Sequence, residues 1–569
     1  MNSNFGEKIK CKLCSKEFFI REEDKKFYKQ MSPKFNNKKY LIPTPKLCPK
    51  CRQQRRISFR NDRKLYKNVC DATWKSIISA YSPDKDYKVY SYPEWWSDKW
   101  EWLDYWMDFD FSRTFFDQFE DLMKKVPRYS LYNFGNENCD YVQYAPYNKN
   151  CYLIFWAMYN EDCFYWGTLF KCKNSVDNFF LFDSQNCYEC VYSQNCFSSS
   201  YCYDCENIRK CYFNYDCNNC ENCIFSFNLR NKKNYIFNKK ASKEEIENMK
   251  KEIFSSKLKE EEYYKKFFSE LDRSAIFKYY HWKSNVNISG NYLYNSKDLF
   301  ECYLWYDSEN ISYSVRFKDQ KDSYDVTWCL WWSYLLDCSS CDFGYKNMFC
   351  LDSERCQECM YVDITHSCKN CFWCVWLKNK EYCILNKQYS KEKYYKLVPK
   401  IITNMQKTWE WWELFPSSIS PFWYNETIAD DYFPLSRTEA ISNNFKWKDE
   451  EKSEYKWKVY QPLKIEKYDE KKTKEAKTNK EDLLNGVLKC SESGKPFKII
   501  KKELEFYIKN NLSIPNKHYD IRYISRMNLK NNYELFDRKC SNCWTGIKTT
   551  YIDQNKKVCC EKCYESLVW

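Results

Sequence analysis

"NCYECVYSQNCFSSSYCYDCENIRKC" occupies residues 186–211, and its spacing determines how the middle of the chain can fold. Its common unit is Asn-Cys-aromatic, and the cysteines of neighbouring units stand nine or twelve residues apart. Cys139, Cys151 and Cys163, earlier in the chain, are twelve apart. Short units that bury one face by stacking on their neighbours are typical of solenoid proteins. These units are too short for helices and rich in Tyr, Phe and Cys, so we predict a β-solenoid.

The middle of the chain is duplicated. "NLRNKKNYIFNKKASKEE" (228–245) matches "WLKNKEYCILNKQYSKEK" (376–393) with an offset of 148 residues. The same offset superposes five cysteine pairs: Cys190 on Cys338, Cys202 on Cys350, Cys211 on Cys359, Cys220 on Cys368 and Cys223 on Cys371. The sequence therefore predicts two tandem repeats, at 130–240 and 285–390.

The two ends of the chain also resemble each other. "CKLCSKEFFIREEDKKFY" (11–28) aligns with "CSESGKPFKIIKKELEFY" (490–507), and "RQQRRISFRNDRKLYKNVC" (52–70) aligns with "RYISRMNLKNNYELFDRKC" (522–540) without a gap. We therefore expect the chain to begin and end with the same small module.

These observations predict a mainly β protein with added helices. Terminal zinc-ribbon modules flank two tandem Cys- and aromatic-rich β-solenoid-like repeats, which helical connectors join. A Lys- and Glu-rich stretch indicates a solvated linker. The predicted parts are an N-terminal zinc-ribbon module (1–96), an aromatic connector (97–129), the first Cys-rich repeat (130–240), a helical connector (241–284), the second Cys-rich repeat (285–390), a helical and irregular segment (391–446), the charged linker (447–482) and a C-terminal zinc-ribbon module (483–569).

Each terminal module contains four cysteines with the spacing of a metal site. In the C-terminal module two CxxC pairs are separated by an insert of hairpin length, and in the N-terminal module a longer insert includes a predicted helix near 22–30. Four thiolates form a closed tetrahedral zinc site, which stabilises a fold and leaves no position open for catalysis. We predict about two structural Zn²⁺ ions, and adjacent Cys559 is not expected to be a ligand. The predicted ligands are Cys11, Cys14, Cys48 and Cys51 at one end and Cys540, Cys543, Cys560 and Cys563 at the other.

Alignment of the modules shows that each has room for a second site, and that each end has lost the site which the other end kept. We therefore expect two metal ions and not four. The degenerate sets are Cys70, Thr73, Ser91 and Glu94 in the first module and Cys490, Ser493, His518 and Ile521 in the second.

A basic segment follows in each module, with cations at steps of four that would share one face of a helix. One interpretation is contact with phosphates of a nucleic acid. The other is a solvated face whose arginines pair with local carboxylates. The candidate phosphate contacts are Arg52, Arg56, Arg60, Arg522, Arg526 and Lys530.

The cysteines of the repeats allow three interpretations. They can be buried thiols that pack as small hydrophobic side chains. They can hold metal, through the clusters Cys217/Cys220/Cys223 and Cys368/Cys371/Cys374. They can be redox pairs such as Cys187/Cys190 and Cys356/Cys359, although redox catalysis usually needs one activated thiolate and not many similar thiols.

Composition limits the remaining classes. The formal net charge is +14, which favours anionic partners, and 35 cysteines stand beside 3 histidines. The N-terminus has no apolar leader and no run approaches about eighteen apolar residues, so we expect a cytoplasmic protein without a membrane partner. In a reducing cytoplasm cysteines are metal ligands or buried thiols and not disulfides.

Enzyme signatures are missing from the sequence. GxGxxG, GxxxxGK[ST], HExxH and GxSxG do not occur, and three histidines leave little scope for a Cys–His or Ser–His pair. We expect a protein that is not an enzyme and has no small-molecule substrate. Nucleic-acid binding by the basic helices is the leading hypothesis. A protein-interaction scaffold built on the solenoid is second, and thiol or metal handling is third.

Several stretches resemble an uncharacterised bacterial family of large zinc-ribbon, cysteine-rich proteins: "KPFKIIKKELEFYIKNNLSIP" (495–515), "LCPKCRQQRRISFRNDRKLYK" (47–67), "AYSPDKDYKVY" (80–90) and "FWYNETIADDYFPL" (422–435). The resemblance covers almost the whole chain. Such proteins are sometimes labelled CaiB/BaiF family, but nothing in this chain resembles a CoA-transferase. The resemblance implies zinc-ribbon ends around a Cys-rich middle.

Glycine is scarce and tryptophan is abundant. There are 8 glycines and 23 tryptophans, whereas average usage would give roughly 40 glycines. Trp74 and Trp544 each follow the turn of a cysteine pair or its remnant, at a position that is usually glycine in the resembling family. The stretch "WEWWELFP" (409–416) looks like a family "GEWGEFFP". Trp106 and Trp423 also stand at family glycines. Some bacteria read UGA as glycine. We hypothesise that many of these tryptophans are glycines in the native protein.

Overall fold

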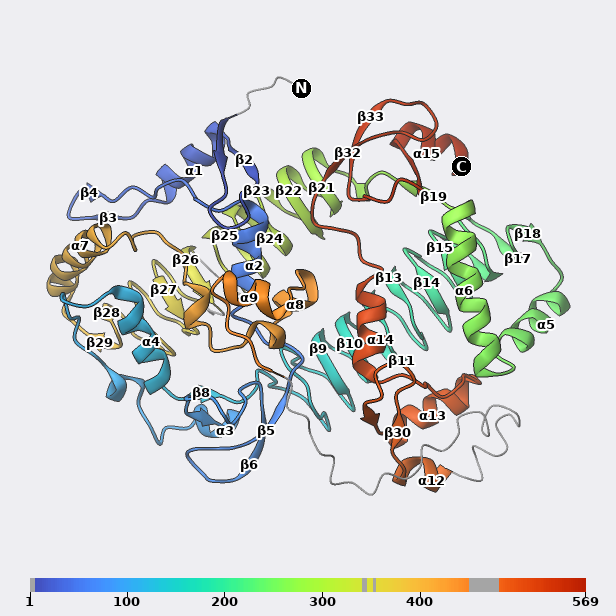
Figure 1. Cartoon of the computed structure of the whole chain (residues 1–569), viewed down its shortest axis with the longest axis horizontal. Coiled ribbons are helices and arrows are strands. Elements are labelled where there is room, and N and C mark those ends of the chain that lie inside the picture. Colours follow the sequence, from blue (N-terminus) through green and yellow to red (C-terminus); the bar gives the residue numbers. More distant parts are fainter. Residues whose placement is uncertain (1–5, 340–344, 352–354, 450–479, 569) are drawn as a thin grey trace. The chain divides into compact units, whose positions relative to one another are not determined.

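A computed structural model describes residues 6–339, 345–351, 355–449 and 480–568 (Figure 1). The chain divides into two compact units. The N-terminal module shares a unit with the second repeat, and the C-terminal module shares a unit with the first. Unit 1 comprises residues 1–131, 280–449 and 533–535, and unit 2 comprises residues 132–279, 450–532 and 536–569.

Unit 2 contains a ten-stranded sheet in which all neighbouring strands are parallel except the last pair. Each residue pairs with the residue twelve positions further along the chain, as Tyr152 does with Phe164 and Phe164 with Val176. We call this part, residues 138–237, the first stack. Its strands, with the short β18, are β9 (Tyr152–Met158), β10 (Glu161–Phe170), β11 (Lys173–Val176), β12 (Phe179–Phe182), β13 (Val191–Gln194), β14 (Ser200–Tyr203), β15 (Tyr212–Tyr215), β16 (Glu221–Ile224), β17 (Lys233–Ile236) and β18 (Lys239–Lys240).

Unit 1 contains an eight-stranded parallel sheet of the same kind, which we call the second stack (284–385). Its register changes from eleven to twelve residues between Ile288 and Gly290. Gly290 has φ +145°, and a Cβ there would lie 1.7 Å from the carbonyl oxygen of Cys302, so this position requires glycine. The strands are β20 (Trp282–Lys283), β21 (Val286–Tyr294), β22 (Lys297–Tyr306), β23 (Glu309–Ser312), β24 (Val315–Tyr324), β25 (Thr327–Leu336), β26 (Tyr345–Leu351) and β27 (Met360–Asp363), followed by the hairpin β28 (Cys383–Ile384) and β29 (Lys387–Gln388).

The stacks are built on a period of three. From 138 to 237 every third residue has a positive φ, and the same spacing recurs over 292–328 and 355–385. The residues that follow these turns form the inner core of the first stack: all buried members of its core cluster, from Val142 to Leu229, occupy such positions. Many of the left-handed positions are Asn or Asp, which tolerate that conformation better than other side chains. The cysteine spacings of nine and twelve are multiples of this shorter period.

The buried cysteines of the stacks are held as hydrogen-bond donors. Cys163 Sγ lies 3.3 Å from the carbonyl oxygen of Glu161 and 3.4 Å from that of Cys172. The same two contacts, two residues back and nine ahead, recur at Cys187, and the hydroxyl of Ser193 makes them too. Carbonyl oxygens only accept hydrogen bonds, so they favour the neutral thiol, and burial raises the pKa of Cys172 to about 12. Of the three interpretations, this arrangement supports structural packing.

The terminal modules share one order of elements: a hairpin, two helices and a second hairpin. The first module continues through β7 into α3 (Tyr92–Trp95), and β7 pairs with the later strand β8. The second module ends in β34 and α15, and β34 pairs with β19. The first module contains β1 (Glu7–Lys10), β2 (Glu17–Ile20), α1 (Glu22–Met31), β3 (Lys34–Phe35), β4 (Lys38–Lys39), α2 (Pro49–Ile57), β5 (Tyr66–Val69), β6 (Ser76–Ser79), β7 (Val89–Tyr90) and β8 (Arg128–Tyr129). The second contains α12 (Lys480–Asn485), β30 (Leu488–Lys489), β31 (Pro496–Phe497), α13 (Lys501–Asn510), α14 (Tyr519–Met527), β32 (Phe536–Lys539), β33 (Gly546–Thr549), β34 (Lys557–Cys559) and α15 (Glu561–Val568).

Helices connect these parts. Helix α5 (Lys243–Ile253) begins at Ser242, whose hydroxyl accepts a bond from Glu245 N while the Glu245 side chain caps Ser242 N. The predicted helical connector thus holds α5 and α6. None of the helices in the described residues is both long and apolar enough to cross a membrane. The remaining elements are α4 (Phe115–Lys125), α6 (Lys257–Ser274), β19 (Ile276–Lys278), α7 (Lys391–Lys407), α8 (Ile428–Tyr432), α9 (Arg437–Ser442) and the 3₁₀ turns Trp102–Tyr105, Ser417–Ile419 and Tyr424–Glu426.

The coarse fold prediction is confirmed: the chain is mixed, with extensive sheets, helices between them and a four-cysteine cluster at each end. The predicted helix near 22–30 is α1. Most of the predicted charged linker, 450–479, lies outside the described residues.

We predict that Cys187→Ser lowers the free energy of unfolding by less than about 1 kcal/mol, because a hydroxyl can donate to the same carbonyls. Cys187→Asp should lower it by more than about 3 kcal/mol, because it buries a carboxylate beside two acceptor oxygens. Urea unfolding of the two variants tests this. Equal losses would contradict the assignment of Cys187 as a donor.

Candidate metal centres and the buried basic helices

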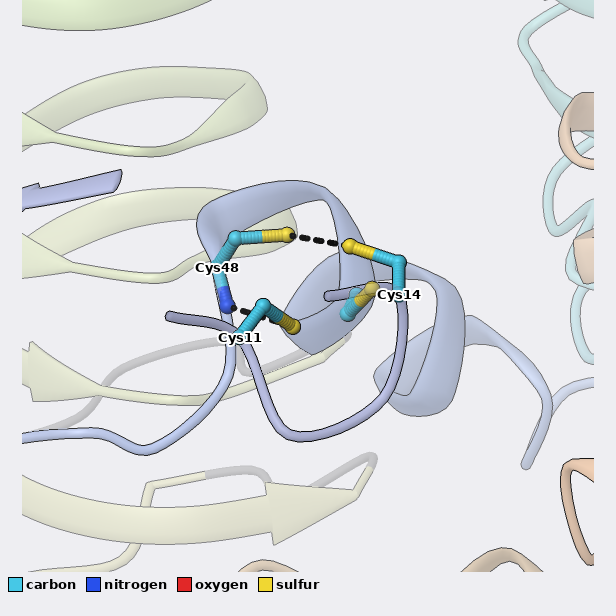
Figure 2. A group of neighbouring side chains, drawn as sticks. Cys11, Cys14 and Cys48 are labelled. Carbon is cyan, nitrogen blue, oxygen red and sulfur yellow. Dashed lines mark hydrogen bonds between the residues drawn. The ribbon is translucent and has the colours of Figure 1, made fainter. Parts of the chain in front are cut away.

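The N-terminal cysteines form one cluster (Figure 2). The turn between β1 and β2 supplies Cys11 and Cys14, Cys48 is the residue before α2, and Cys51 lies in its first turn. All four sulfur atoms lie within 4.8 Å of one another. Cys14 Sγ is 3.7 Å from Cys48 Sγ, and Cys48 N donates to Cys11 Sγ at 3.3 Å.

The C-terminal cysteines form the same arrangement. Cys540, Cys543, Cys560 and Cys563 also lie within 4.8 Å of one another. Cys560 N donates to Cys540 Sγ at 3.3 Å, which matches the N-terminal contact, and Cys543 Sγ is 3.6 Å from Cys560 Sγ. The neighbouring Cys559 belongs to β34 and is outside the cluster, as the spacing predicts.

Both clusters have the chemistry of a closed thiolate site. Burial opposes the charged form of Cys540, but backbone N–H groups of Cys543 and Cys560 donate to its sulfur and lower its pKa to about 6. Four sulfurs at this separation suit a tetrahedral ion, and no fifth protein group or open position is needed. These are therefore possible metal centres of the structural kind.

The two degenerate sites keep the turn that follows the first cysteine, but they lack the other three cysteine ligands. Cys70 N donates to Lys75 O at 2.9 Å and Ser91 N donates to Cys70 Sγ at 3.3 Å, which are the contacts that Cys11 makes in the intact site. Cys490 N likewise donates to Lys495 O at 2.9 Å. Within the described residues only the two terminal four-cysteine groups bring three or more ligand atoms together, and neither the degenerate sets nor the cysteine triplets of the repeats do so.

The helices that carry the candidate phosphate contacts are buried in the fold. In unit 1, Arg52 Nε lies 2.8 Å from Asp325 and Arg56 lies 2.5 Å from Asp337, with all four side chains at most 5% exposed. Helix α2 ends at Ile57, so Arg60 is not on the predicted helix face; it pairs with a neighbouring carboxylate at 2.6 Å.

Unit 2 repeats these contacts. Arg522 in α14 pairs with Asp177, and Arg526 lies 3.0 Å from Asp177 and 2.9 Å from Glu189. Lys530 follows the helix and is half-buried.

The phosphate-contact prediction therefore needs correction for the five arginines. Each is engaged by a carboxylate, and reaching a phosphate would leave that acid buried without its partner. Helical spacing placed Arg52 with Arg56, and Arg522 with Arg526, on one helix face, but it misplaced Arg60 and could not identify what covers the face. The corrected residues are Arg52, Arg56, Arg60, Arg522 and Arg526.

Sequence reasoning missed the acidic and tyrosine partners. The signal was available: Asp177 and Asp325 are related by the offset of 148, and so are Glu189 and Asp337. Each acid stands at a left-handed position of its stack. The matching contacts are Arg52–Asp325 with Arg522–Asp177, Arg56–Asp337 with Arg526–Glu189, and Tyr313–Asp24 (2.8 Å) with Tyr165–Glu503 (2.7 Å).

The unit 2 cluster carries one more acid than base. Arg522 and Arg526 face Asp177, Glu189 and Glu503. Burial raises the pKa of Glu503, and it raises the pKa of Glu189 to about 7 although Arg526 opposes the shift. In unit 1 a third cation balances the set, because Arg21 lies 2.5 Å from Asp24, whereas the aligned residue of the other module is Ile500.

No model of a known protein family matches this chain, and no curated protein matches it. The resemblance to a zinc-ribbon, cysteine-rich family accordingly stays a prediction.

We predict that Cys560→Ser removes about one equivalent of bound metal per chain, whereas Cys559→Ser removes none. The two residues are adjacent, but only Cys560 belongs to the group of four whose ligand atoms lie within 4.8 Å of one another. Metal analysis of purified variants provides the measurement. Equal metal loss in both would show that the cluster is not the site.

The buried acids predict an unusual pH dependence in unit 2. The folded pKa of Glu189 is above its unfolded value of about 4.3, so its contribution to stability is present below that value and is lost as pH rises through about 7. Between pH 4.5 and 8 the free energy of unfolding of the unchanged protein should decrease because of Glu189. In Glu189→Gln this decrease should be smaller by on the order of 3 kcal/mol. Urea unfolding at both pH values, with exposed Glu206→Gln as control, tests this; an unchanged pH slope would refute it.

Proposed function

We propose that this protein is a non-enzymatic, zinc-binding scaffold. In this proposal the two stacks are β-solenoid-like bodies, the terminal modules are zinc ribbons anchored on them, and the first stack binds a protein partner. The observation that supports the proposal most is a row of identical exposed side chains along the first stack.

That row consists of Asn195, Asn207, Asn219 and Asn231, which are all exposed and twelve residues apart. Asn195 donates to Asn207 at 3.0 Å and Asn219 donates to Asn231 at 3.1 Å. Since each step of a parallel sheet is about 4.8 Å, the amides form a straight, evenly spaced line of donors and acceptors. Such a fixed line on a rigid body is suited to an extended backbone or polar surface of another protein.

Zinc is the metal that we propose for both clusters. Four cysteine sulfurs without a histidine or carboxylate suit zinc in a structural, tetrahedral site. Each ion would tie a hairpin to a following helix, as Cys11 and Cys48 do in the first module. This role needs no substrate and agrees with the lack of an enzyme signature in the sequence.

Nucleic-acid binding loses its main support, because the arginines that motivated it are paired inside the two units. A protein partner accounts for the exposed amides of the first stack. Thiol or metal handling by the stacks is also disfavoured, because their sulfurs face carbonyl oxygens.

The scaffold proposal is tested by purifying the protein from its host after nuclease treatment and in 0.5 M salt. A protein partner should co-purify, and the variant Asn207→Lys/Asn219→Lys should lose it while it keeps its metal content. The matched control Asn287→Lys/Asn310→Lys changes exposed amides of the second stack and should retain the partner. Loss of the bound material on nuclease treatment, or equal binding by both variants, would overturn the proposal.

A further inference from the structure

Left-handed backbone positions outside the stacks fall into a narrow set of residue types. Within the described residues these positions hold asparagine, glycine, serine or tryptophan, and nothing else. Asparagine and glycine are the residues that adopt this conformation at least cost, whereas a bulky aromatic side chain is an outlier there. The positions are Asn36, Asn37, Asn238, Asn386, Asn444, Asn511, Gly135, Gly494, Ser15, Trp74, Trp409, Trp412 and Trp544.

Two of these tryptophans stand in the cysteine turns of the terminal modules: Trp74 in the degenerate site of the first module and Trp544 in the C-terminal cluster. Ser15, Trp74, Gly494 and Trp544 are the same position in four copies of one turn, with φ of 60°, 58°, 68° and 60°. In each copy the residue's N–H donates to the carbonyl oxygen of the cysteine four residues earlier, at 2.7–3.1 Å. One copy is glycine, so the turn itself accepts that residue.

A third tryptophan terminates a helix. Helix α7 ends at Lys407 with Thr408 as its cap, and Trp409 follows with φ +62°. Glu410 N donates to Met405 O at 2.9 Å, which is the closing bond of a Schellman motif. The left-handed residue of that motif is usually glycine.

The same tryptophans make little use of their side chains. Trp74 and Trp409 are each 81% exposed and Trp544 is 72% exposed, which places them among the most exposed large apolar residues of the described chain. Trp95 and Trp411 differ: both are buried, neither has a positive φ, and their indole N–H groups donate to Pro127 O at 3.0 Å and Leu41 O at 3.2 Å.

We propose that residues 74, 409, 412 and 544 are glycine in the native protein, because their codons are UGA read as glycine, and that Trp95 and Trp411 are genuine tryptophans encoded by UGG. Composition alone does not distinguish these groups, and the resemblance already placed residues 74, 409, 412 and 544 at family glycines. A positive φ separates residues 74, 409, 412 and 544 from Trp95 and Trp411, and high exposure also separates 74, 409 and 544, whereas Trp412 is half-buried. The cysteine turns then have the small turn residue that the conformation demands.

Peptide mass spectrometry of the protein isolated from its own host tests the proposal. Tryptic peptides 68–75 and 540–548 should each carry glycine at the single tryptophan position. Peptide 408–437 should carry glycine at 409 and 412 and retain tryptophan at 411. Masses that match tryptophan at 74, 409, 412 and 544 would overturn the proposal.

A recombinant series gives a second test. Trp74→Gly, Trp409→Gly and Trp544→Gly should each leave metal content unchanged and raise the melting temperature by roughly 1–3 °C. Trp95→Gly and Trp411→Gly should lower it by several degrees, because they remove buried rings. Lower melting temperatures in the first group would contradict the assignment.

Discussion

Two buried arginines in each terminal module hold that module on its stack, and the rest of each unit depends on these ion pairs. In unit 1, Arg52 and Arg56 reach Asp325 and Asp337, more than 270 residues away. Removing one partner of such a pair typically costs about 3–5 kcal/mol, because the other charge is left buried. The pairs therefore specify where the module docks as much as they stabilise it. Unit 2 contains the matching set of buried ion pairs, which indicates that the same arrangement of module and stack is repeated in both units.

The second constraint is the backbone of the stacks. A left-handed residue at every third position turns the chain, and the residue that follows is buried. Small side chains suit those buried positions, and cysteine, serine and asparagine can also donate to the carbonyl oxygen nine residues ahead, as Cys163 and Ser193 do. This explains the high cysteine content without any redox or metal chemistry in the middle of the chain. Eight cysteines at the two ends thus form the possible metal centres, and those of the stacks act as packing side chains and donors.

The sequence was sufficient for features that follow from spacing. The two four-cysteine clusters, the exclusion of Cys559 from them, the helix near 22–30 and the doubling of the terminal modules were all predicted from the sequence. The period of three was hidden, because only some of the third positions are cysteine and intervals of nine and twelve dominate. The face of α2 was predicted, but the carboxylate that covers Arg52 lies far away in sequence, so its burial could not follow from local pattern.

The central claim is that the two terminal four-cysteine clusters hold metal, and that the described cysteines of the stacks are packing side chains and hydrogen-bond donors. Zinc content per chain, measured together with thiol reactivity before and after unfolding, tests it most directly. The account predicts about two zinc ions, with the remaining thiols unreactive until the protein unfolds. Four or more ions, or rapid reaction of many thiols in the folded protein, would place chemistry in the stacks and contradict the account.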